Sequence, residues 1–327
     1  MNNYTPPYNT TDEMLELVSE IMECLGQLSG VNDLAKLPKL RRINRIKSIH
    51  SSLAIEHNSL SIEQVSDIIN GKRVLGAPDE IQEVKNAIEA YKLLENLDPY
   101  KINDLLKAHK AMTNGLIEES GKFRSGEEGV FAGERCIHVA PPAKNVPGLM
   151  QDLFDWLNIT KIHPLIKSSV FHYEFEFIHP FRDGNGRTGR FWQTAILSRW
   201  KPIFAWIPVE SMIIDKQEEY YSAISRSTAA GNSNPFILFM LEAFLQAIKV
   251  LVNDSGDHLN HTNERVRQLM VVIKDYPMTA AELMQLLKLK SRETFRQNYL
   301  IPAIEAGLIS MTSPEKPTSR NQMYYKK

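Results

Sequence analysis

Residues 179–190 read HPFRDGNGRTGR and join two predicted helices. The first helix, IKSSVFHYEFEF at residues 166–177, must end near Pro180, because proline disfavours helical backbone in the residue that precedes it. The second helix is predicted to start near Gly186 and to continue through RFWQTAIL. The residues between them, from Asp183 to Gly186, tolerate positive φ angles, so this stretch predicts a tight loop at a helix N-terminus.

This loop has the composition of a phosphate-binding site. Backbone N–H groups exposed at a helix N-terminus bind anions, and the helix dipole adds to the attraction. Arg187 and Arg190 are three residues apart on the second helix, so both guanidinium groups can reach one oligophosphate. Asp183 supplies a hard oxygen ligand for Mg²⁺, and His179 at the edge of the loop is placed to act as a general base. Together these positions predict a nucleotide-handling transferase site rather than an ordinary turn.

The composition of the whole chain is that of a globular protein. The chain has 327 residues, a length that predicts two domains or one large domain with an appendage. Hydrophobic residues make up 43% and charged residues 24%, which excludes wholesale disorder. The 38 Lys and Arg residues nearly balance the 39 Asp and Glu residues, which excludes a globally basic nucleic-acid coat and a strongly acidic protein.

Cysteine use and hydropathy predict a cytoplasmic protein that does not span a membrane. Cys24 and Cys136 are too few for a disulfide framework or a cysteine-rich zinc site, and we expect free thiols in a reducing compartment. The N-terminus lacks the basic and apolar regions of a signal peptide. The most apolar stretch, residues 235–251, is interrupted by polar residues and predicts a buried helix.

Helical periodicity dominates the rest of the sequence. It predicts helices over residues 12–28, 37–56, 80–96, 101–116, 146–158, 165–178, 186–200, 215–229 and 235–253. Ser61 and Gln64 form a capping-box pattern that predicts a further helix closed by Gly71. Strand signals are few, and the clearest lies in residues 128–142, where β-prone pieces around Gly133 predict a hairpin-like flap.

The last part of the chain has a pattern of its own. A polar break at residues 253–263 predicts a linker. Three predicted helices follow, the second capped by Thr279 and Glu282, and then a hairpin, which is the order of a winged helix-turn-helix module. From Lys288 onward there are eight Lys and Arg residues and three Asp and Glu residues. This excess suits DNA, but Pro302 in the third helix favours protein docking or dimerisation, and a purely structural role stays open.

The segment at 179–190 resembles the signature of the Fic (filamentation induced by cAMP) family, His-x-Phe-x-Asp/Glu-Gly-Asn-Gly-Arg-x-x-Arg. The signature positions are met by His179, Phe181, Asp183, Gly184, Asn185, Gly186, Arg187 and Arg190. The resemblance covers roughly residues 40–250 and includes residues 105–126 ahead of the flap. In the flap itself it rests on Val130, Phe131, Ala132 and Gly133. The related Doc kinases carry Lys at the position of Gly186, which disfavours a kinase-type pose of the nucleotide.

The resemblance implies a protein adenylyltransferase that transfers AMP from ATP to a Ser, Thr or Tyr hydroxyl of a target protein. His179 would accept the hydroxyl proton, Asp183 would bind Mg²⁺, and the flap would hold an extended segment of the target. The ATP-binding residues would be Asp183, Gly184, Asn185, Gly186, Arg187, Thr188, Gly189 and Arg190, with Tyr220 and Tyr221 beside the adenine. Arg187 would hold the β-phosphate and Arg190 the γ-phosphate.

Family members often carry an inhibitory helix with the pattern Ser/Thr-x-x-x-Glu-Gly/Asn. Ser52 and Glu56 fit this pattern and precede the core. By resemblance, Glu56 would pair with Arg190 and occupy the site of the γ-phosphate. His57 stands where Gly or Asn is usual, so the end of this helix stays open.

We therefore expect a mainly α protein with a Fic-type helical core, a small β-hairpin flap and a C-terminal winged helix-turn-helix domain. Its expected parts are an N-terminal helical region at 1–100 with the inhibitory helix at about 43–57, a catalytic core at 101–252 and a winged helix domain at 262–327. Expected partners are a target protein, the chain itself through self-modification or a homodimer, and DNA. The open alternatives are removal of AMP, transfer of another nucleotide, and a DNA-binding regulator whose core senses nucleotide.

Overall fold

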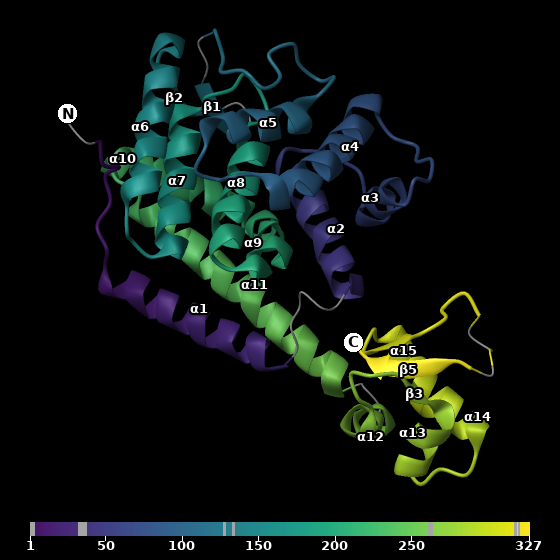
Figure 1. Cartoon of the computed structure of the whole chain (residues 1–327). Helices are drawn as coiled ribbons and strands as arrows, with labels where there is room; N and C mark the ends of the chain where they lie inside the picture. The colour runs from purple at the N-terminus through teal and green to yellow at the C-terminus, as the bar shows by residue number, and fades with distance from the viewer. Residues whose placement is uncertain are drawn as a thin grey trace. The chain divides into compact units, whose positions relative to one another are not determined.

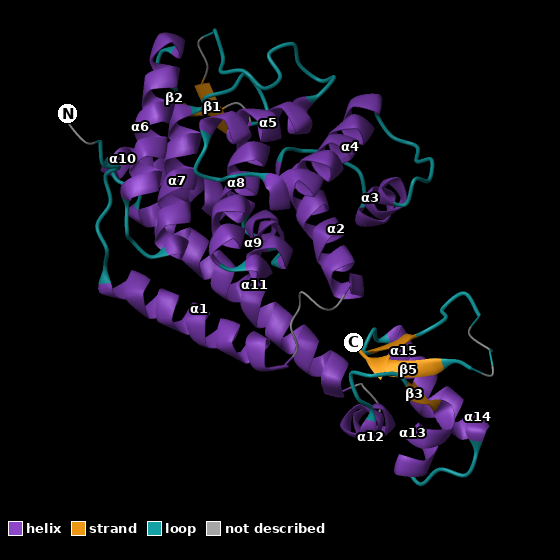
Figure 2. Ribbon diagram, in the orientation of Figure 1, coloured by secondary structure: helices purple, strands orange, loops and turns teal. Residues whose placement is uncertain are grey.

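The computed structural model describes residues 4–31, 38–126, 129–132, 135–260, 264–316, 319 and 321–327. The chain forms two compact units (Figure 1). The first comprises Met1–Leu25 and Ile43–Lys249, and the second comprises Gly26–Arg42 and Val250–Lys327. Both units are mainly helical, and the strands are confined to one hairpin and one small sheet (Figure 2). The predicted fold class is confirmed.

The predicted helices up to residue 260 are all present, and most of their ends lie within three residues of the predicted ones. They are α1 (Asp12–Val31), α2 (Pro38–Ile55), α3 (Ile62–Ile69), α4 (Pro78–Leu93), α5 (Ile102–Thr113), α6 (Val146–Ile159), α7 (Pro164–Ile178), α8 (Asn185–Trp200), α10 (Gln217–Ala230) and α11 (Asn234–Asn260). The short helix α9 (Val209–Asp215) was not predicted, because seven residues show too little periodicity. Short 3-10 turns, η2 (Leu94–Asn96), η3 (Ala143–Asn145) and η4 (Pro202–Trp206), connect some of them.

Helices α7 and α8 form the centre of the first unit (Figure 1). Both are buried over most of their length, and Phe171, Phe175 and Trp192 are fully buried. The two helices approach closely at Gly189, where a Cβ would come within 2.7 Å of Glu176 Oε1. This packing fixes the end of α7 and the start of α8 on either side of the loop at residues 179–184.

Helix α11 is longer than the sequence predicted. It continues to Asn260 through residues that we expected to form a linker. Gly256 is the residue there that most disfavours a helix, and one glycine costs only about 1 kcal/mol, too little to end a helix by itself. Residues Asn234–Asn253 have a mean hydropathy of 1.9 and could cross a bilayer by length and composition, but 61% of this window is buried inside the protein, as in a core helix.

The predicted flap is an antiparallel hairpin. Strand β1 (Gly129–Ala132) pairs with β2 (Arg135–Val139), with an irregularity between Val130 and Phe131. Gly133, which the sequence analysis assigned to the flap, lies outside the described residues.

The second unit ends in short helices and a three-stranded sheet. The helical segments are α12 (Glu264–Val272), α13 (Ala280–Leu286), α14 (Arg292–Phe295), the π-helical η5 (Arg296–Leu300) and α15 (Ile301–Glu305). The antiparallel strands β3 (Met278–Thr279), β4 (Ile309–Met311) and β5 (Met323–Lys326) lie in the order β3-β5-β4. Leu269, Leu283 and Phe295 are at the centre of its core. This arrangement is compatible with the expected winged helix-turn-helix.

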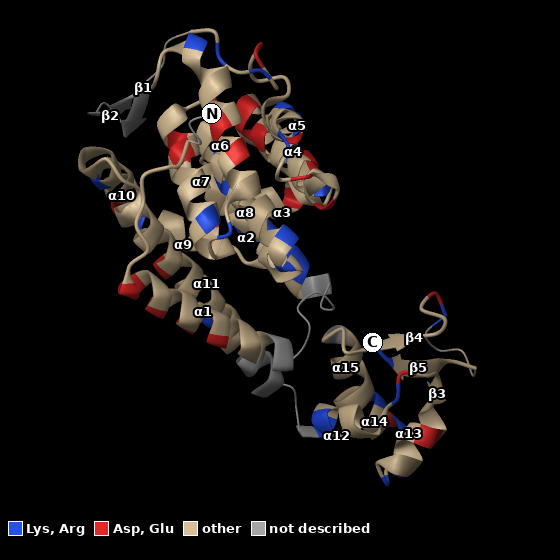
Figure 3. Cartoon of the chain, turned by 60° about the vertical axis from the view of Figure 1, so that its left-hand side comes forward, with Lys and Arg blue, Asp and Glu red and all other residues tan. Residues whose placement is uncertain are grey.

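Two local predictions in this unit have clear outcomes. The capping box of Thr279 and Glu282 is present at the start of α13. The third predicted helix divides into α14, η5 and α15, because Pro302 has no N–H to donate and the wider π turn lets the chain remain helical. Basic side chains mark α12, and an acidic one marks α13 (Figure 3).

A Schellman motif closes α2 and settles where this helix ends. The Asn58 N–H bonds to the Leu53 carbonyl over 3.2 Å, and the His57 N–H bonds to the Ala54 carbonyl over 3.0 Å. Glu56 is therefore the C-cap residue directly after Ile55, and His57 follows in the left-handed region with a φ of 68°. Glycine is common at this position because it has no Cβ to cause strain.

We predict that His57→Gly stabilises the first unit by about 0.5–1 kcal/mol, because it relieves left-handed backbone strain at an exposed residue. Urea unfolding measures the change. The matched control is His57→Ala, which keeps a Cβ and should give no gain. Equal stability of the glycine and alanine variants would contradict the prediction.

Candidate functional site

The loop between α7 and α8 is held by unusual backbone and by one amide side chain. His179 caps α7 in the left-handed region with φ 49° and ψ 61°, and Gly184 precedes α8 with a φ of 78°. Asn185 binds both main-chain groups of Phe181: its Oδ1 accepts from the Phe181 N–H at 2.9 Å, and its Nδ2 donates to the Phe181 carbonyl at 2.8 Å. The side chain of Asn185 therefore shapes the loop itself.

A buried histidine supports the same loop from α5. The His109 ring stacks on Phe181 at 3.6 Å between ring centroids. Its Nε2 donates to the Asp183 carbonyl at 2.9 Å, and its Nδ1 accepts from the Gly121 N–H at 2.9 Å. Burial lowers the pKa of His109 to about 4. Geometry favours the neutral ring too, because a proton on Nδ1 would point at the Gly121 N–H.

Arg124 joins the loop to both ends of the flap. Its Nε donates to the His179 carbonyl at 2.7 Å. The Nη1 and Nη2 groups donate to the carbonyls of Gly126 and Pro141, which lie on either side of the hairpin. The Arg124 N–H also donates to the Pro180 carbonyl at 2.9 Å. One buried guanidinium therefore sets the position of the flap relative to His179.

The start of α8 presents amides that have no partner within the helix, together with two buried arginines. The first helical bond runs from the Thr188 N–H to the Gly184 carbonyl, so the amides of residues 185–187 have no partner within the helix. Arg187 is 4% exposed and binds Glu83 Oε1 at 2.8 Å and Asp183 Oδ2 at 3.0 Å. The two arginines thus place positive charge beside these amides, and the charge of Arg187 is already paired with two carboxylates.

Arg190 is 2% exposed and is bound by the end of α2. Its Nε donates to Ser52 Oγ at 3.1 Å, and its Nη2 donates to the Ser52 carbonyl at 2.9 Å and to Glu56 Oε1 at 2.8 Å. Burial alone would lower the pKa of Arg190, but its interactions with Glu56, Tyr220 and Glu176 together raise this pKa. Residues 52 and 56, far from the loop in sequence, thus reach it in space.

The carboxylate of Glu56 lies in the space where α8 would meet an anion. A Cβ added to Gly186 would overlap Glu56 Oε1 and come within 2.9 Å of Arg190 Nη1. The Glu56 side chain is 34% exposed, so it lies at the mouth of the site rather than in the core. A phosphate approaching Arg190 and the first-turn amides would compete with this carboxylate.

Asp183 is the predicted metal ligand, and its surroundings fit one Mg²⁺ brought by phosphates. Its side chain is 53% exposed, with Oδ1 accepting from the Gly184 N–H at 2.6 Å and Oδ2 binding Arg187. Mg²⁺ typically takes one or two carboxylates and completes its shell with water and phosphate oxygens. The described residues contain no group of three or more His, Cys, Asp and Glu side chains that could hold a metal by themselves.

The other predicted residues occupy less exposed positions. Thr188 is fully buried, and Gly189 faces α7. Tyr220 is 1% exposed, with its hydroxyl 3.3 Å from His172 Nε2. Tyr221 is partly exposed, and its hydroxyl lies 3.5 Å from the Ile55 carbonyl oxygen. Of the two tyrosines, Tyr221 therefore has the surface that an adenine ring could contact. The flap side chains lie outside the described set, and the flap backbone is as given above.

Sequence reasoning missed three residues of the site, namely Glu83, His109 and Arg124. Their contacts with Arg187, Asp183 and His179 join residues 55 to 104 positions apart in the sequence. His109 and Arg124 fall within residues 105–126, a segment that the resemblance already covered, but no local pattern indicates what they bind. Glu83 is an unremarkable acidic residue on an amphipathic helix, and nothing in the sequence singles it out.

Two stretches of the chain match known families. Residues 97–197 match the Fic/DOC family. Residues 264–325 match a family described as the C-terminal domain of filamentation induced by cAMP protein Fic-like. The first stretch contains the loop, α7 and most of α8, and the second contains the helices and sheet of the second unit.

Two curated relatives share the core. The chain is 29% identical to protein adenylyltransferase Fic of Nematostella vectensis over 234 residues, which are 68% of this chain and 52% of that protein. It is 30% identical to protein adenylyltransferase Fic of Culex quinquefasciatus over 229 residues, 66% of this chain and 43% of that protein. The chain thus spans about half the length of the curated relatives it matches.

Solved structures share the fold over more of the chain. The crystal structure of a Fic family protein from Desulfovibrio desulfuricans G20 matches with a TM-score of 0.74 and 48% identity, covering 99% of this chain and 98% of that chain. A fragment of Fic-1 from C. elegans has the same fold, with a TM-score of 0.60 and 22% identity over 74% of each chain.

We predict that His109 makes the protein less stable in acid. Its pKa is lower in the folded protein than in the unfolded chain, so its contribution is complete above about pH 6.5 and is lost as the pH falls through about 4. The loss is at most about 3 kcal/mol. The free energy of unfolding, measured by urea titration, should fall more steeply between these pH values for the wild type than for His109→Gln. The glutamine keeps a donor for Asp183 but does not titrate. Parallel pH profiles would contradict this.

Proposed function

Because the chain belongs to the Fic family, we propose that it is a protein adenylyltransferase, which transfers AMP from ATP to a Ser, Thr or Tyr hydroxyl of a target protein. The observation that carries the proposal is the set of groups at the start of α8: free first-turn amides, Arg187 and Arg190, with His179 at the adjoining end of α7. The names of the curated relatives support the same activity.

In the proposed reaction, each group of the loop has one task. The first-turn amides of α8 hold the α- and β-phosphates of ATP. His179 accepts the proton of the target hydroxyl, whose oxygen forms a bond to the α-phosphorus while the bond to pyrophosphate breaks. Arg187 and Arg190 stabilise the negative charge that collects on the leaving pyrophosphate. Mg²⁺, when bound at Asp183, would neutralise phosphate charge.

Arg124 and the flap add orientation to this scheme. The hydrogen bonds of Arg124 hold the His179 carbonyl and both flap ends in one frame. A target segment that pairs with a flap strand through its main chain would then present its hydroxyl at a fixed distance from His179. Arg124 is a positioning residue in this scheme, since it contacts the loop backbone and not the reacting atoms.

We further propose that Glu56 inhibits the enzyme. Its carboxylate pairs with Arg190, which the reaction needs for the γ-phosphate, and lies against Gly186 at the start of α8. Charge-assisted hydrogen bonds of this kind are about twice as strong as neutral ones. ATP in a productive pose must therefore displace Glu56 first. We also propose that the enzyme can transfer AMP to itself and that Glu56 limits this self-modification.

Two variants of the chemistry use the same site. Glu56 could orient a water molecule for removal of AMP, or the loop could accept a nucleotide other than ATP. Comparing labelled nucleotide donors in one transfer assay separates these from AMP transfer.

The second unit is proposed to dock partners. Arg292 and Arg296 are exposed on α14 and η5, beside a cavity of about 660 Å³. These positions suit an acidic protein surface, a second copy of the chain, or DNA. A gel shift of the full chain with duplex DNA that weakens steeply with salt would favour a DNA-binding regulator.

Cys24 is a free buried thiol, in keeping with the reducing cytoplasm where we place the protein.

Removal of the inhibitory carboxylate is predicted to activate the enzyme. Glu56→Gly should raise incorporation of AMP from labelled ATP, including self-modification, by about tenfold or more, because it removes a charge-assisted hydrogen bond to Arg190. Glu56→Gln keeps a hydrogen-bonding amide without the charge and should give an intermediate rate. Equal labelling by the wild type and both variants would refute inhibition by Glu56.

Loss of the base is predicted to abolish transfer. His179→Ala, made in the activated Glu56→Gly background, should lower labelling by about 10²–10⁴-fold. The matched control is His163→Asn, because His163 caps the other end of α7 through Nδ1, a contact that asparagine can replace, and its ring packs against Trp200 rather than the loop. Undiminished labelling by the His179 variant would exclude it as the base.

A further inference from the structure

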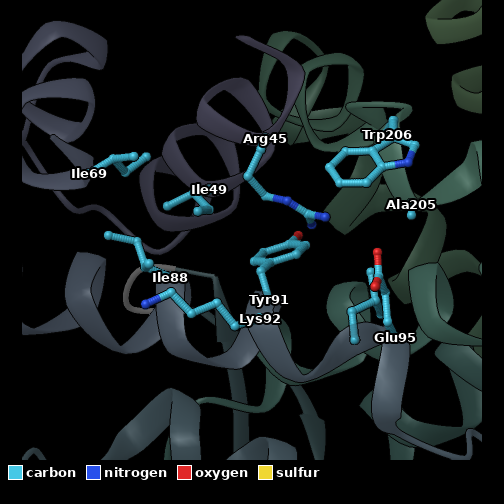
Figure 4. Close-up of a pocket in the computed structure, with 10 residues that line it drawn as sticks. Arg45, Ile49, Ile69, Ile88, Tyr91, Lys92, Glu95, Ala205 and Trp206 are labelled. Carbon is cyan, nitrogen blue, oxygen red and sulfur yellow. The ribbon is translucent and has the colours of Figure 1, made fainter. Parts of the chain in front are cut away.

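A cavity of about 310 Å³ lies under α2, far from the loop in sequence but within the first unit (Figure 4). This size is at the small end of known ligand pockets. Its walls come from α2, α3, α4, η2 and η4. The apolar end is formed by Ile49, Ile69 and Ile88, and the other end by Arg45, Tyr91 and Trp206.

The guanidinium of Arg45 is the inner polar group of this cavity, and the charges of Glu210 and Glu95 act on it. Its Cζ lies 4.3 Å from the centroid of the Tyr91 ring and 4.6 Å from that of Trp206, so the flat faces of the cation are used by aromatic rings. The edge of the guanidinium has an unused hydrogen-bond donor. Its Nη1 is buried, and no acceptor among the described residues lies within hydrogen-bonding distance of it. A buried donor without an acceptor is costly, so a ligand oxygen there would be stabilising.

The rest of the lining selects the ligand. A planar guanidinium edge matches a carboxylate better than any other common anion except phosphate. The three isoleucines require a hydrocarbon body, which a phosphate lacks. Glu95 lies at the exposed rim, and its charge would repel a second carboxylate. Lys92 at the same rim is paired with Glu89 at 2.7 Å.

We propose that this cavity binds a small monocarboxylic acid with an apolar body, and that the bound acid holds the inhibitory helix in place. The regulatory part rests on the proposed inhibition by Glu56. The binding part does not, because it follows from the cavity and from the unpaired Nη1 of Arg45 alone.

One face of α2 connects the cavity to Arg190. Arg45, Ile49, Ser52 and Glu56 follow one another at intervals of four, three and four residues, so they lie along one side of the helix. The first two line the cavity, and the last two bind Arg190. A movement of α2 that withdraws Glu56 therefore also withdraws one wall of the cavity.

The opposite wall leads to the same arginine. The Tyr91 hydroxyl donates to Glu210 Oε1 at 3.2 Å, and the Tyr91 ring packs edge-on against Phe191 at 5.1 Å. Phe191 adjoins Arg190 in α8, and the charge of Arg190 acts on buried Glu210. Both walls of the cavity are thus within one or two contacts of the Arg190 guanidinium, to which Glu56 is bound.

The direction of the effect follows from linkage. The acid contacts Arg45 and Ile49 only while α2 is in the position that places Glu56 on Arg190, so it binds that state more tightly. ATP requires the other state. The two ligands must therefore weaken each other's binding, although their sites do not overlap.

The first experiment tests binding. Hydrocinnamate, titrated into the protein of residues 1–327 and followed by calorimetry and ligand-observed NMR, should bind saturably. Arg45→Met keeps an unbranched apolar stem between the rings and should weaken binding by about tenfold or more. Ile69→Trp fills the apolar end, leaves Arg45 intact and should also prevent binding. Hydrocinnamyl alcohol and phenylsuccinate should bind far more weakly than hydrocinnamate. No binding by the wild type, or equal binding by Arg45→Met, overturns the site.

The second experiment tests coupling by the same binding readout. ATP should weaken hydrocinnamate binding several-fold in the wild type and leave it unchanged in Glu56→Gly, where α2 no longer competes with ATP. Binding that ignores ATP in the wild type overturns the regulatory role. A failure of AMP transfer in every assay would overturn the proposed function but would leave both binding results standing.

Discussion

The buried guanidinium of Arg190 is the constraint on which the first unit depends. With 2% of its surface exposed, this charge is stable only when acceptors and an opposite charge surround it. Ser52 and Glu56 supply them from α2. Because the same guanidinium lies near the start of α8, the anion that pairs with it would also decide whether the proposed phosphate site is open.

The two partners of this ion pair differ in how firmly they are held. Arg190 is buried between packed helices, whereas Glu56 is partly exposed and caps the C-terminal end of α2. The end of α2 is fixed by the Schellman motif and by Gln217, which donates to the Ile55 carbonyl at 2.8 Å. The supports of the loop between α7 and α8 are separate: Asn185, His109 and Arg124 all bind its main chain. Glu56 can therefore leave without disturbing the loop.

Much of the fold could be predicted from the sequence where the cause is local. Capping boxes and apolar stripes predicted most helices, and the capping box at Ser61 is present as expected. The failures have equally physical causes. Helix α11 continues through Gly256 because a single glycine is too weak a signal to end it, and β3 escaped notice because two residues form a strand only when β5 pairs with them.

By itself, the sequence determined the chemistry of the loop, because residues 179–190 are contiguous and their backbone preferences, charges and spacing act locally. It also indicated Glu56, through a short motif that resembles a family pattern. Only the tertiary structure decided that Glu83 binds Arg187, that Arg124 joins the flap to His179, and that Arg45 faces a cavity. These contacts join residues dozens of positions apart, and helix packing, which no local pattern encodes, brings them together.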